Sequence, residues 1–323
     1  MRAVVCTKYG PPEVLQLQDV TKPMPGPREV LVRIRATTVS MGDFRIRSFT
    51  VPALVWLPAR LVLGIRGPRQ SILGIELAGQ VEAVGAQVTR FAPGDRIFAA
   101  TLKGFGAYAE YRCLPENGPI ATIPRTLSYE EAAAVPIGAR TALHYLRRAA
   151  VVPGQEVLIF GASGSVGTYA VQLAKHFGAR VTAVSSTANL ELLRSLGADL
   201  VIDYTAGDFS KTGSRYDVVF DAVGKCPFAD AMNVLKAGGT YLNCTPAMPS
   251  LSMLRMKLTG ARKLILGEGP PETPEALEFV GDLIAAGKLR VVVDRRYTLD
   301  QMVEAHKYVD QGHKKGNVVV SVA

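Results

Sequence analysis

The chain has 323 residues, of which 48% are hydrophobic and 20% charged, a composition typical of a soluble globular protein with two domains. Its richness in Leu, Ile, Val and Phe excludes an intrinsically disordered chain. The formal net charge is +9, from 37 Lys and Arg against 28 Asp and Glu, which favours anionic partners. The basic residues are spread along the chain without a recognition motif, so nucleic-acid binding is not expected.

Two uncharged stretches, Val157–Ala174 and Ala237–Leu254, approach the length of a transmembrane helix. Both contain Gly and Ser, and the second also contains Pro, so neither is predicted to face lipid. Lys8 comes before any long apolar segment, which argues against a signal peptide. We therefore expect a cytoplasmic protein without a membrane span.

The cysteines and histidines do not have the spacing of metal ligands. The sequence contains no Cys-x-x-Cys or His-x-x-x-His pair, so no metal site is predicted. The cysteines are expected to be small buried hydrophobic residues in a reducing compartment. The residues concerned are Cys6, Cys113, Cys226, Cys244, His144, His176, His306 and His313.

The first 120 or so residues alternate β-rich runs with turns that contain Gly and Pro, such as Pro93-Gly94-Asp95. This pattern predicts a small β-barrel or sandwich. The expected strands are Arg2–Thr7, Glu29–Thr38, Ala78–Val84 and Asp95–Ala100.

From Ser128 onwards the periodicity becomes helical. Ser128 and Glu131 form a capping box that opens a helix ending before Pro136, and a second helix is expected near Ala139–Ala150. A regular alternation of strands and helices follows, which predicts a parallel doubly wound sheet. Its strands are Glu156–Phe160, Arg180–Val184, Leu200–Asp203, Val218–Asp221 and Thr240–Cys244, and its helices include Val166–Phe177 and Leu190–Leu196.

After about Gly267 the alternation ends. A helix near Pro274–Ala286, a strand Arg290–Val293 and a helix near Leu299–Asp310 are expected, followed by a final strand Val318–Val322. A lone valine-rich strand at the end of the chain is most simply placed in the N-terminal β domain.

The strongest functional signal is Gly161-Ala-Ser-Gly164-Ser-Val-Gly167, which lies between a predicted strand and a predicted helix. Gly161 permits a tight turn, Gly164 lets the backbone approach a pyrophosphate, and Gly167 allows the helix to pack closely on the sheet. The N-terminus of the helix offers N–H groups and partial positive charge to the phosphates. This arrangement predicts a dinucleotide site.

The residues after the next strand indicate which dinucleotide binds. An NAD site usually has Asp or Glu there, to accept a hydrogen bond from the ribose 2′-OH. Here Ser185, Ser186 and Thr187 follow the strand, and the first acid, Glu191, comes a helical turn later. Hydroxyl groups can bind a 2′-phosphate that a carboxylate would repel, so NADP(H) is predicted. Asn189 stands where a lysine would be convenient, and Lys175, Arg180 and Arg194 are open alternatives for the missing cation.

The chain resembles the medium-chain dehydrogenase/reductase superfamily and, within it, the zinc-independent quinone oxidoreductase-like branch. The resemblance covers essentially the whole length. It implies a GroES-like β-barrel catalytic domain at 1–123, a Rossmann NADP(H)-binding domain at 124–266 and a C-terminal segment, 267–323, that returns to the catalytic domain. The motifs that carry it are Gly74-Ile-Glu76-Leu-Ala-Gly79, Pro93-Gly94-Asp95-Arg96, Gly106-Ala-Tyr-Ala-Glu110-Tyr111, Gly138-Ala-Arg-Thr141-Ala, Gly161–Gly167, Leu196-Gly-Ala-Asp199 and Gly316-Asn317-Val318-Val319.

The chain departs from the zinc-dependent relatives in this superfamily. In those relatives Ile75 would be a histidine that binds the metal, and Ile75 has no donor atom. Their first ligand, a cysteine, would fall near Ser40–Gly42, where no cysteine is present, and the four-cysteine structural lobe is absent. The resemblance therefore also implies that no zinc is bound.

The resemblance implies a set of cofactor contacts. Tyr204 could instead simply cap a strand, and Thr141 could be an ordinary hydroxyl inside a helix. Ser163, Gly164, Ser165 and Val166 would bind the pyrophosphate, Ser185 and Ser186 the 2′-phosphate, and Tyr204 the adenosine, while Val223, Cys244, Thr245, Thr141 and Asn317 would lie near the ribose and nicotinamide.

On the substrate side, Ser40 replaces the family's usual Asn, whereas Asp43 matches; Ser40, Met41, Asp43 and Trp56 are the candidate pocket residues. The segment Phe49–Gln70 is longer and more apolar than usual, and could line a pocket, form a packed flap or make an oligomer contact. It lies within Phe44–Ile75, a stretch without acidic residues whose arginines we interpret as a solvated rim or as packing residues. These arginines are Arg45, Arg47, Arg60, Arg66 and Arg69.

Without a metal, oxidation of an alcohol is difficult because its proton has a pKa near that of water, about 15.7. Hydride addition to a quinone or an α,β-unsaturated carbonyl is easier, because the resulting enolate needs only hydrogen bonds and a proton. We therefore expect an NADPH-dependent reductase of small hydrophobic carbonyls or quinones, with Asp43, Tyr108, Tyr111 or water as the proton donor. A metal-free ketone or alcohol oxidoreductase and a non-catalytic NADPH-binding protein are the alternatives. The family resemblance also implies a homodimer, formed through a possible edge strand at Arg262–Leu266.

Overall fold

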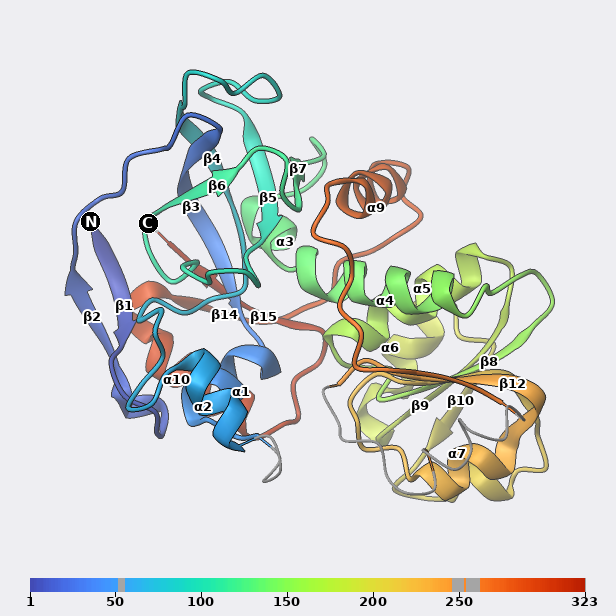
Figure 1. The fold of residues 1–323 in the computed structure, drawn as a ribbon. Helices are drawn as coiled ribbons and strands as arrows, with labels where there is room; N and C mark the ends of the chain where they lie inside the picture. The colour runs from blue at the N-terminus through green and yellow to red at the C-terminus, as the bar shows by residue number, and fades with distance from the viewer. Residues whose placement is uncertain (52–55, 246–252, 254–261, 323) are drawn as a thin grey trace. The chain divides into compact units, whose positions relative to one another are not determined.

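The computed structural model describes residues 1–51, 56–245, 253 and 262–322. Its internal contacts define two compact units (Figure 1). The first unit contains Met1–Ile137, Glu272–Ala286 and Val291–Ala323, and the second contains Gly138–Pro271 and Gly287–Arg290. These units are defined by contact density, so the functional domain limits expected at 123/124 and 266/267 stay a prediction.

The first unit is built on a seven-stranded sheet in the order β14-β15-β3-β4-β5-β7, with β6 also paired to β3. The pairs are antiparallel except for β14 with β15. The strands are β3 (Glu29–Val39), β4 (Glu76–Val84), β5 (Arg96–Ala100), β6 (Tyr111–Pro115), β7 (Ile120–Thr122), β14 (Val293–Thr298) and β15 (Asn317–Ser321), and a separate hairpin pairs β1 (Arg2–Cys6) with β2 (Leu15–Asp19).

The C-terminal valine strand returns to the N-terminal half of the chain, because β15 pairs antiparallel with β3. The expected strand Arg290–Val293 was wrong in position: β14 begins only at Val293 and continues to Thr298. The apolar run around Val291 suggested an early strand. The actual strand is a polar edge, with Arg295 and Arg296 exposed, and such a sequence has no clear hydrophobic alternation.

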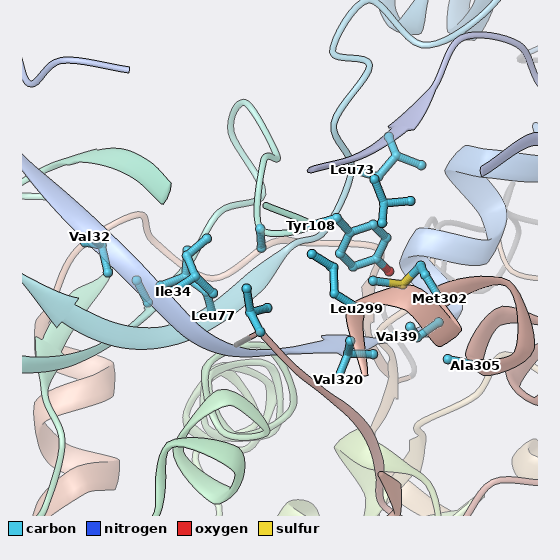
Figure 2. Close-up of a cluster of buried hydrophobic side chains, with 14 of the residues drawn as sticks. Val32, Ile34, Val39, Leu73, Leu77, Tyr108, Leu299, Met302, Ala305 and Val320 are labelled. Atoms are coloured by element: carbon cyan, nitrogen blue, oxygen red, sulfur yellow. The ribbon is translucent and has the colours of Figure 1, made fainter. Parts of the chain in front are cut away.

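Buried side chains from the sheet and from a C-terminal helix form the core of the first unit (Figure 2). The helix α10 contributes Met302 and Ala305 to this core, and it also contacts α1. Tyr108 lies in the same cluster. The helices of this unit are α1 (Met41–Ser48), α2 (Trp56–Leu63), α3 (Tyr129–Ala133), α9 (Glu275–Ala285) and α10 (Met302–Asp310), with short 3₁₀ turns η1 (Pro12–Val14) and η5 (Leu299–Gln301).

The second unit is a six-stranded parallel sheet in the order β10-β9-β8-β11-β12-β13, which confirms the predicted doubly wound arrangement. The order reverses direction between β8 and β11, and ligands of such sheets bind outside the carboxyl ends of the strands at this switch point. The strands are β8 (Glu156–Phe160), β9 (Arg180–Ser185), β10 (Leu200–Asp203), β11 (Tyr216–Asp221), β12 (Leu235–Asn243) and β13 (Lys263–Leu266).

Helices or 3₁₀ turns connect the successive strands from β8 to β12, as expected for parallel strands. They are α5 (Ser165–His176), α6 (Leu190–Ser195) and α7 (Phe228–Val234), with 3₁₀ turns η3 (Thr187–Asn189) and η4 (Phe209–Lys211), and α4 (Pro136–Arg148) precedes the sheet in the chain. The capping box of Ser128 with Glu131 at the start of α3 is confirmed. In the part of the chain that the structure describes, no helix is long and apolar enough to cross a membrane.

Candidate active site

In the glycine-rich turn between β8 and α5, two of the three glycines have no space for a side chain. Gly161 has φ +72°, and a Cβ there would lie 2.6 Å from the methyl groups of Val223. A Cβ on Gly167 would lie 2.3 Å from the carbonyl oxygen of Gly161, so only glycine lets α5 approach the turn this closely. Gly164 differs, because a Cβ there would make only ordinary contacts, the nearest at 3.5 Å. The absence of a side chain at Gly164 therefore leaves open space next to the turn.

The helix α5 begins without a side-chain cap. Gly164 is the N-cap residue, and no side chain caps the helix there. The N–H groups at a helix N-terminus carry partial positive charge and bind phosphate groups. Ser163, Gly164, Ser165 and Val166 all lie at this turn, so the structure brings the predicted pyrophosphate residues together.

A cluster of hydroxyl and amide groups lies at the carboxyl end of β9. The Ser185 hydroxyl donates to the Ser163 hydroxyl at 2.8 Å, which ties the end of β9 to the glycine-rich turn. The Asn189 side-chain amide donates to the hydroxyls of Ser185 and Ser186 at 3.2 and 3.0 Å. The Asn189 Oδ1 atom is buried without a hydrogen-bond partner, so this cluster retains an unused acceptor. Asn189 thus orients both predicted phosphate-binding serines.

An acid that the sequence analysis did not consider lies next to this cluster. Asp203 ends β10, and in the parallel register it is the neighbour of Ser185. Its carboxylate accepts hydrogen bonds from the hydroxyls of Thr187 and Thr205, and these bonds lower its pKa. Sequence analysis missed Asp203 because this residue belongs to β10, and only the pairing of β10 with β9 places it beside Ser185.

Two of the open cation candidates lie at the other end of the sheet. Arg180 is the first residue of β9 and pairs with Glu156, the first residue of β8. Lys175, near the end of α5, pairs with Asp199, which accepts the backbone N–H of Val181. Neither residue lies at the strand end that carries Ser185, so neither is placed to bind a 2′-phosphate there.

Tyr204 and Val223 flank the same edge of the sheet. Tyr204 follows β10, its backbone N–H donates to the carbonyl of Ser185, and its ring is half exposed beside Phe160. Val223 packs against Gly161. The turn after β11 is held by the buried carboxylate of Asp221, which accepts the N–H groups of Val223 at 3.1 Å and of two following residues, Gly224 and Cys226.

The turn after β12 lies against the turn after β11. A Cβ on Gly224 would lie 2.2 Å from the Thr245 hydroxyl, and the thiol of Cys244 donates to the carbonyl of Ala222 at 3.4 Å. Thr245 donates through its N–H and its hydroxyl to the side chain of Asn243. Val223, Cys244 and Thr245 therefore share one edge of the second unit with the glycine-rich turn.

The last two predicted cofactor residues belong to different units. Thr141 is half-buried on α4 in the second unit. Asn317 begins β15 in the first unit, where its side-chain amide donates to the carbonyl of Val292 at 3.1 Å. All of the cofactor contacts stay predictions.

In the first unit, Ser40 and Asp43 form a reciprocal cap at the start of α1. The Ser40 hydroxyl accepts the N–H groups of Gly42 and Asp43, and Asp43 accepts the N–H and hydroxyl of Ser40 at 3.0 and 2.7 Å. Asp43 is completely buried, and burial raises its pKa to about 6. Met41, half-buried, is the first residue of the helix. The Asp43 carboxylate therefore has a clear structural task.

The two tyrosines proposed as proton donors have different surroundings. Tyr108 is completely buried, its hydroxyl lies 3.2 Å from Nε2 of His306, and burial and the charge of Asp43 raise its pKa. Burial lowers the pKa of His306 to about 3, so this imidazole is neutral. Tyr111, on β6, lies under the ammonium group of Lys22 at 3.9 Å. Tyr108 therefore lies close to Asp43, whereas Tyr111 lies beside Lys22.

Two ionisable residues, Glu76 and Lys314, were not predicted as site residues from the sequence. Glu76 is buried at the start of β4, where it accepts the Thr38 hydroxyl and the N–H of Ile137, and burial raises its pKa to about 7. Lys314 donates to the carbonyl of Gly316 at 2.6 Å, and burial lowers its pKa to about 8 despite the attraction of Glu76. The signal in the sequence was Glu76 itself, an acid between the apolar residues Ile75 and Leu77.

The described residues do not offer the donor set of a metal site. Ile75 is buried and has no donor atom. Among residues 1–51, 56–245, 253 and 262–322, no group of three His, Cys, Asp or Glu side chains could hold a metal.

Two family models and several known proteins are similar to this chain. Residues 26–125 match the family described as the alcohol dehydrogenase GroES-like domain, and residues 196–320 match the family described as zinc-binding dehydrogenase. The chain is 34% identical over 332 residues to the 2-methylene-furan-3-one reductase of Solanum lycopersicum, covering 99% of this chain and 79% of that protein.

Two further similarities cover nearly all of the chain. It is 32% identical to the chloroplastic NADPH-dependent alkenal/one oxidoreductase of Arabidopsis thaliana, over 99% of this chain and 79% of that protein. The solved structure of the quinone oxidoreductase from Coxiella burnetii superposes with a TM-score of 0.90 at 28% identity, over 100% of this chain and 99% of that chain. The chain therefore belongs to the medium-chain dehydrogenase/reductase superfamily, in its quinone oxidoreductase-like branch.

Proposed function

We propose that the protein is an NADPH-dependent oxidoreductase that reduces a quinone or an α,β-unsaturated carbonyl without zinc. The observation that carries the proposal is the turn from Gly161 to Gly167, which lies at the switch point of the parallel sheet and leads into an uncapped helix. The names of the similar proteins, which include an alkenal/one oxidoreductase and a quinone oxidoreductase, support this reaction class.

The residues of the second unit fit a nicotinamide dinucleotide. The space beside Gly164 and the N–H groups that begin α5 would accept the diphosphate. The hydroxyls of Ser185 and Ser186, oriented by Asn189, would bind the adenosine ribose and its 2′-phosphate. The half-exposed ring of Tyr204 would lie against the adenosine. When bound, NADPH supplies the hydride.

The preference for NADPH over NADH rests on the end of β9. Its hydroxyl groups can donate to a phosphate, and no carboxylate follows the strand directly. Asp203 acts against this preference, but its oxygens are occupied by Thr187 and Thr205. The expected result is therefore a preference for NADPH that Asp203 limits.

Zinc independence is supported by the side chains that stand at the ligand positions. Ile75 cannot bind a metal, and Ser40 at the start of α1 is engaged in a helix cap. Hydride addition to a conjugated carbonyl does not need a Lewis acid, because the negative charge spreads onto the carbonyl oxygen and hydrogen-bond donors can stabilise it. Asp43 and Tyr108 are completely buried. We therefore propose that water delivers the proton, with Tyr111, which is only partly buried, as the alternative donor.

The test is a panel of acceptors, followed by the absorbance of NADPH or NADH, with the bound metal measured on the same sample. Turnover of a quinone or an enone with NADPH, at a metal content well below one per chain, is the expected result. Turnover of only a secondary alcohol or a simple ketone would favour the metal-free ketone or alcohol oxidoreductase. Cofactor binding without any turnover would instead indicate a non-catalytic NADPH-binding protein.

We also propose a cytoplasmic homodimer. The strand β13 is at the edge of the six-stranded sheet, and an edge strand can pair with a second copy of itself. Light scattering on the purified protein measures the mass directly, and a monomer at working concentration would reject the dimer.

A further inference from the structure

A short helix in the first unit exposes apolar side chains to an unusual degree. The helix α2 has eight residues, Trp56–Leu63, and none of them is buried. Leu57 is 63% exposed, Leu61 56% and Val62 71%, and Ile65 in the following turn is 69% exposed. Single exposed apolar residues are common, but a group of this size on consecutive turns marks an interaction surface. We call these four residues the α2 face.

The segment is held in a defined conformation, so the exposure is built into the fold. The guanidinium group of Arg60 packs on the rings of Tyr9, Phe49 and Trp56, at 4.6, 4.1 and 4.9 Å from their centroids. Its Nη1 atom donates to the carbonyl of Ile65, and the Tyr9 hydroxyl donates to the carbonyl of Gly64 at 3.0 Å. The inner side of α2 is thus bound to the unit, while its outer side has no partner among the described residues.

The segment that carries this face has only positively charged side chains among its ionised residues. The sequence from Phe44 to Ile75 contains no acidic residue, and the chain as a whole carries a net charge of +9. Arg66 is exposed in the turn next to Ile65, and Arg69 is held over the same turn by a hydrogen bond to the carbonyl of Leu61 at 2.6 Å. Leucine, tryptophan and arginine side chains on a short helix are the combination that inserts into the headgroup region of an anionic bilayer.

We propose that the α2 face docks the protein on the surface of an anionic membrane. Leu57, Leu61, Val62 and Ile65 would enter the boundary between headgroups and acyl chains, and Arg66 and Arg69 would contact the lipid phosphates. Apolar side chains that are exposed to water do not stabilise the protein, so their exposure indicates a binding surface. The arginines beside the α2 face complement the negative charge of an anionic bilayer. The inference goes beyond the proposed reaction, and its test needs neither cofactor nor substrate.

The chain contains one tryptophan, Trp56, and this residue lies at the start of the same helix. The full-length protein is titrated with vesicles of phosphatidylcholine alone or of equal parts phosphatidylcholine and phosphatidylserine. Binding is measured by co-sedimentation and by the emission of Trp56. We expect binding only to the vesicles with phosphatidylserine, with a blue shift of the emission that added salt reverses.

Two variants and two matched controls locate the surface. The double variant Leu61→Gln/Val62→Gln should weaken vesicle binding at least about tenfold, because it removes inserted apolar area. Arg66→Gln should weaken it about fivefold, the usual effect of one basic residue near an anionic surface. Leu200→Gln and Arg125→Gln change exposed residues of the same types elsewhere and should bind as the parent does.

Several results would overturn the proposal. One is the absence of co-sedimentation and of a blue shift with the anionic vesicles, and another is equal binding to both kinds of vesicle. If Leu61→Gln/Val62→Gln instead converts an oligomer to a monomer without lipid, the face is covered by a second copy. If the double variant raises only the KM for a hydrophobic acceptor and leaves vesicle binding unchanged, the face belongs to the substrate pocket.

Discussion

Gly164 and Gly167 lie three residues apart in the same turn. Replacing Gly167 by alanine should lower the stability, whereas replacing Gly164 should lower the affinity for NADPH. A Cβ at position 167 would lie 2.3 Å from the Gly161 carbonyl oxygen and 2.7 Å from backbone atoms of Ala162. These are backbone atoms of a tight turn, so no flexible side chain can move aside. A Cβ at position 164 would meet nothing closer than 3.5 Å.

Gly167→Ala should therefore destabilise the second unit. Overpacking of this kind costs about 1–3 kcal/mol. For a unit of this size that corresponds to a melting temperature lower by roughly 3–10 °C. Gly164→Ala should melt close to the parent, since the cost of alanine at an N-cap and the lower entropy of its unfolded chain each amount to less than about 1 kcal/mol. Its Cβ should instead occupy the space of the diphosphate and weaken NADPH binding at least about tenfold.

Thermal unfolding without cofactor and calorimetric titration with NADPH separate the two effects. Gly207→Ala is the matched control, because a Cβ there would have no neighbour within 4 Å. Parent-like melting of Gly167→Ala would show that the turn can relax and that the close contact is not required. Parent-like NADPH affinity of Gly164→Ala would refute the assignment of this turn to the diphosphate.

Three further changes probe other parts of the molecule. Asp203→Asn removes a negative charge beside Ser185 and should raise the affinity for NADPH several-fold while changing that for NADH less, as measured by titration with both. Glu76 has a pKa raised from 4.5 to about 7, so the folded state binds its proton more tightly than the unfolded state. Its contribution to the free energy of unfolding is complete below pH 4.5 and is lost as the pH rises to about 7. This loss should amount to at most about 3 kcal/mol, and Glu76→Gln should remove it from urea unfolding curves recorded across that range. Arg47→Met removes the guanidinium group that lies 2.6 Å from the Asp310 carboxylate. It should lower the free energy of unfolding of the first unit, measured in urea, by about 3 kcal/mol. The double variant with Asp310→Asn should recover part of this loss, because it removes the unpaired charge. A parent-like unfolding midpoint for Arg47→Met would contradict this.

The local parts of the fold were predictable because their signals lie within a few residues. The strand β8 has the expected limits, Glu156–Phe160, and the capping box of Ser128 starts α3 as predicted. The glycine-rich turn could be recognised because steric requirements at Gly161 and Gly167 restrict these positions to glycine. Each of these features depends on the residue itself and on its immediate neighbours in the chain.

The parts that escaped prediction depend on which strands are neighbours. Asp203 lies beside Ser185 only because β10 pairs with β9, and the sequence places these residues eighteen positions apart. Arg180 and Lys175 were reasonable cations by sequence distance, but both lie at the opposite end of the strands. A parallel sheet collects the carboxyl ends of its strands at one edge, so distance along the chain does not indicate proximity in the site.

The burial of Asp43 is the reason why we propose water, and not this carboxyl group, as the proton donor. A carboxylate that matches a family position is a reasonable candidate for a proton donor when only the sequence is known. In the structure its Oδ2 atom accepts the N–H and hydroxyl of Ser40, and the side chain has no exposed surface. A proton donor must reach its acceptor within hydrogen-bond distance, directly or through one water. In the structure Asp43 fixes the first turn of α1, and so it positions two other pocket candidates, Ser40 and Met41, at the start of this helix.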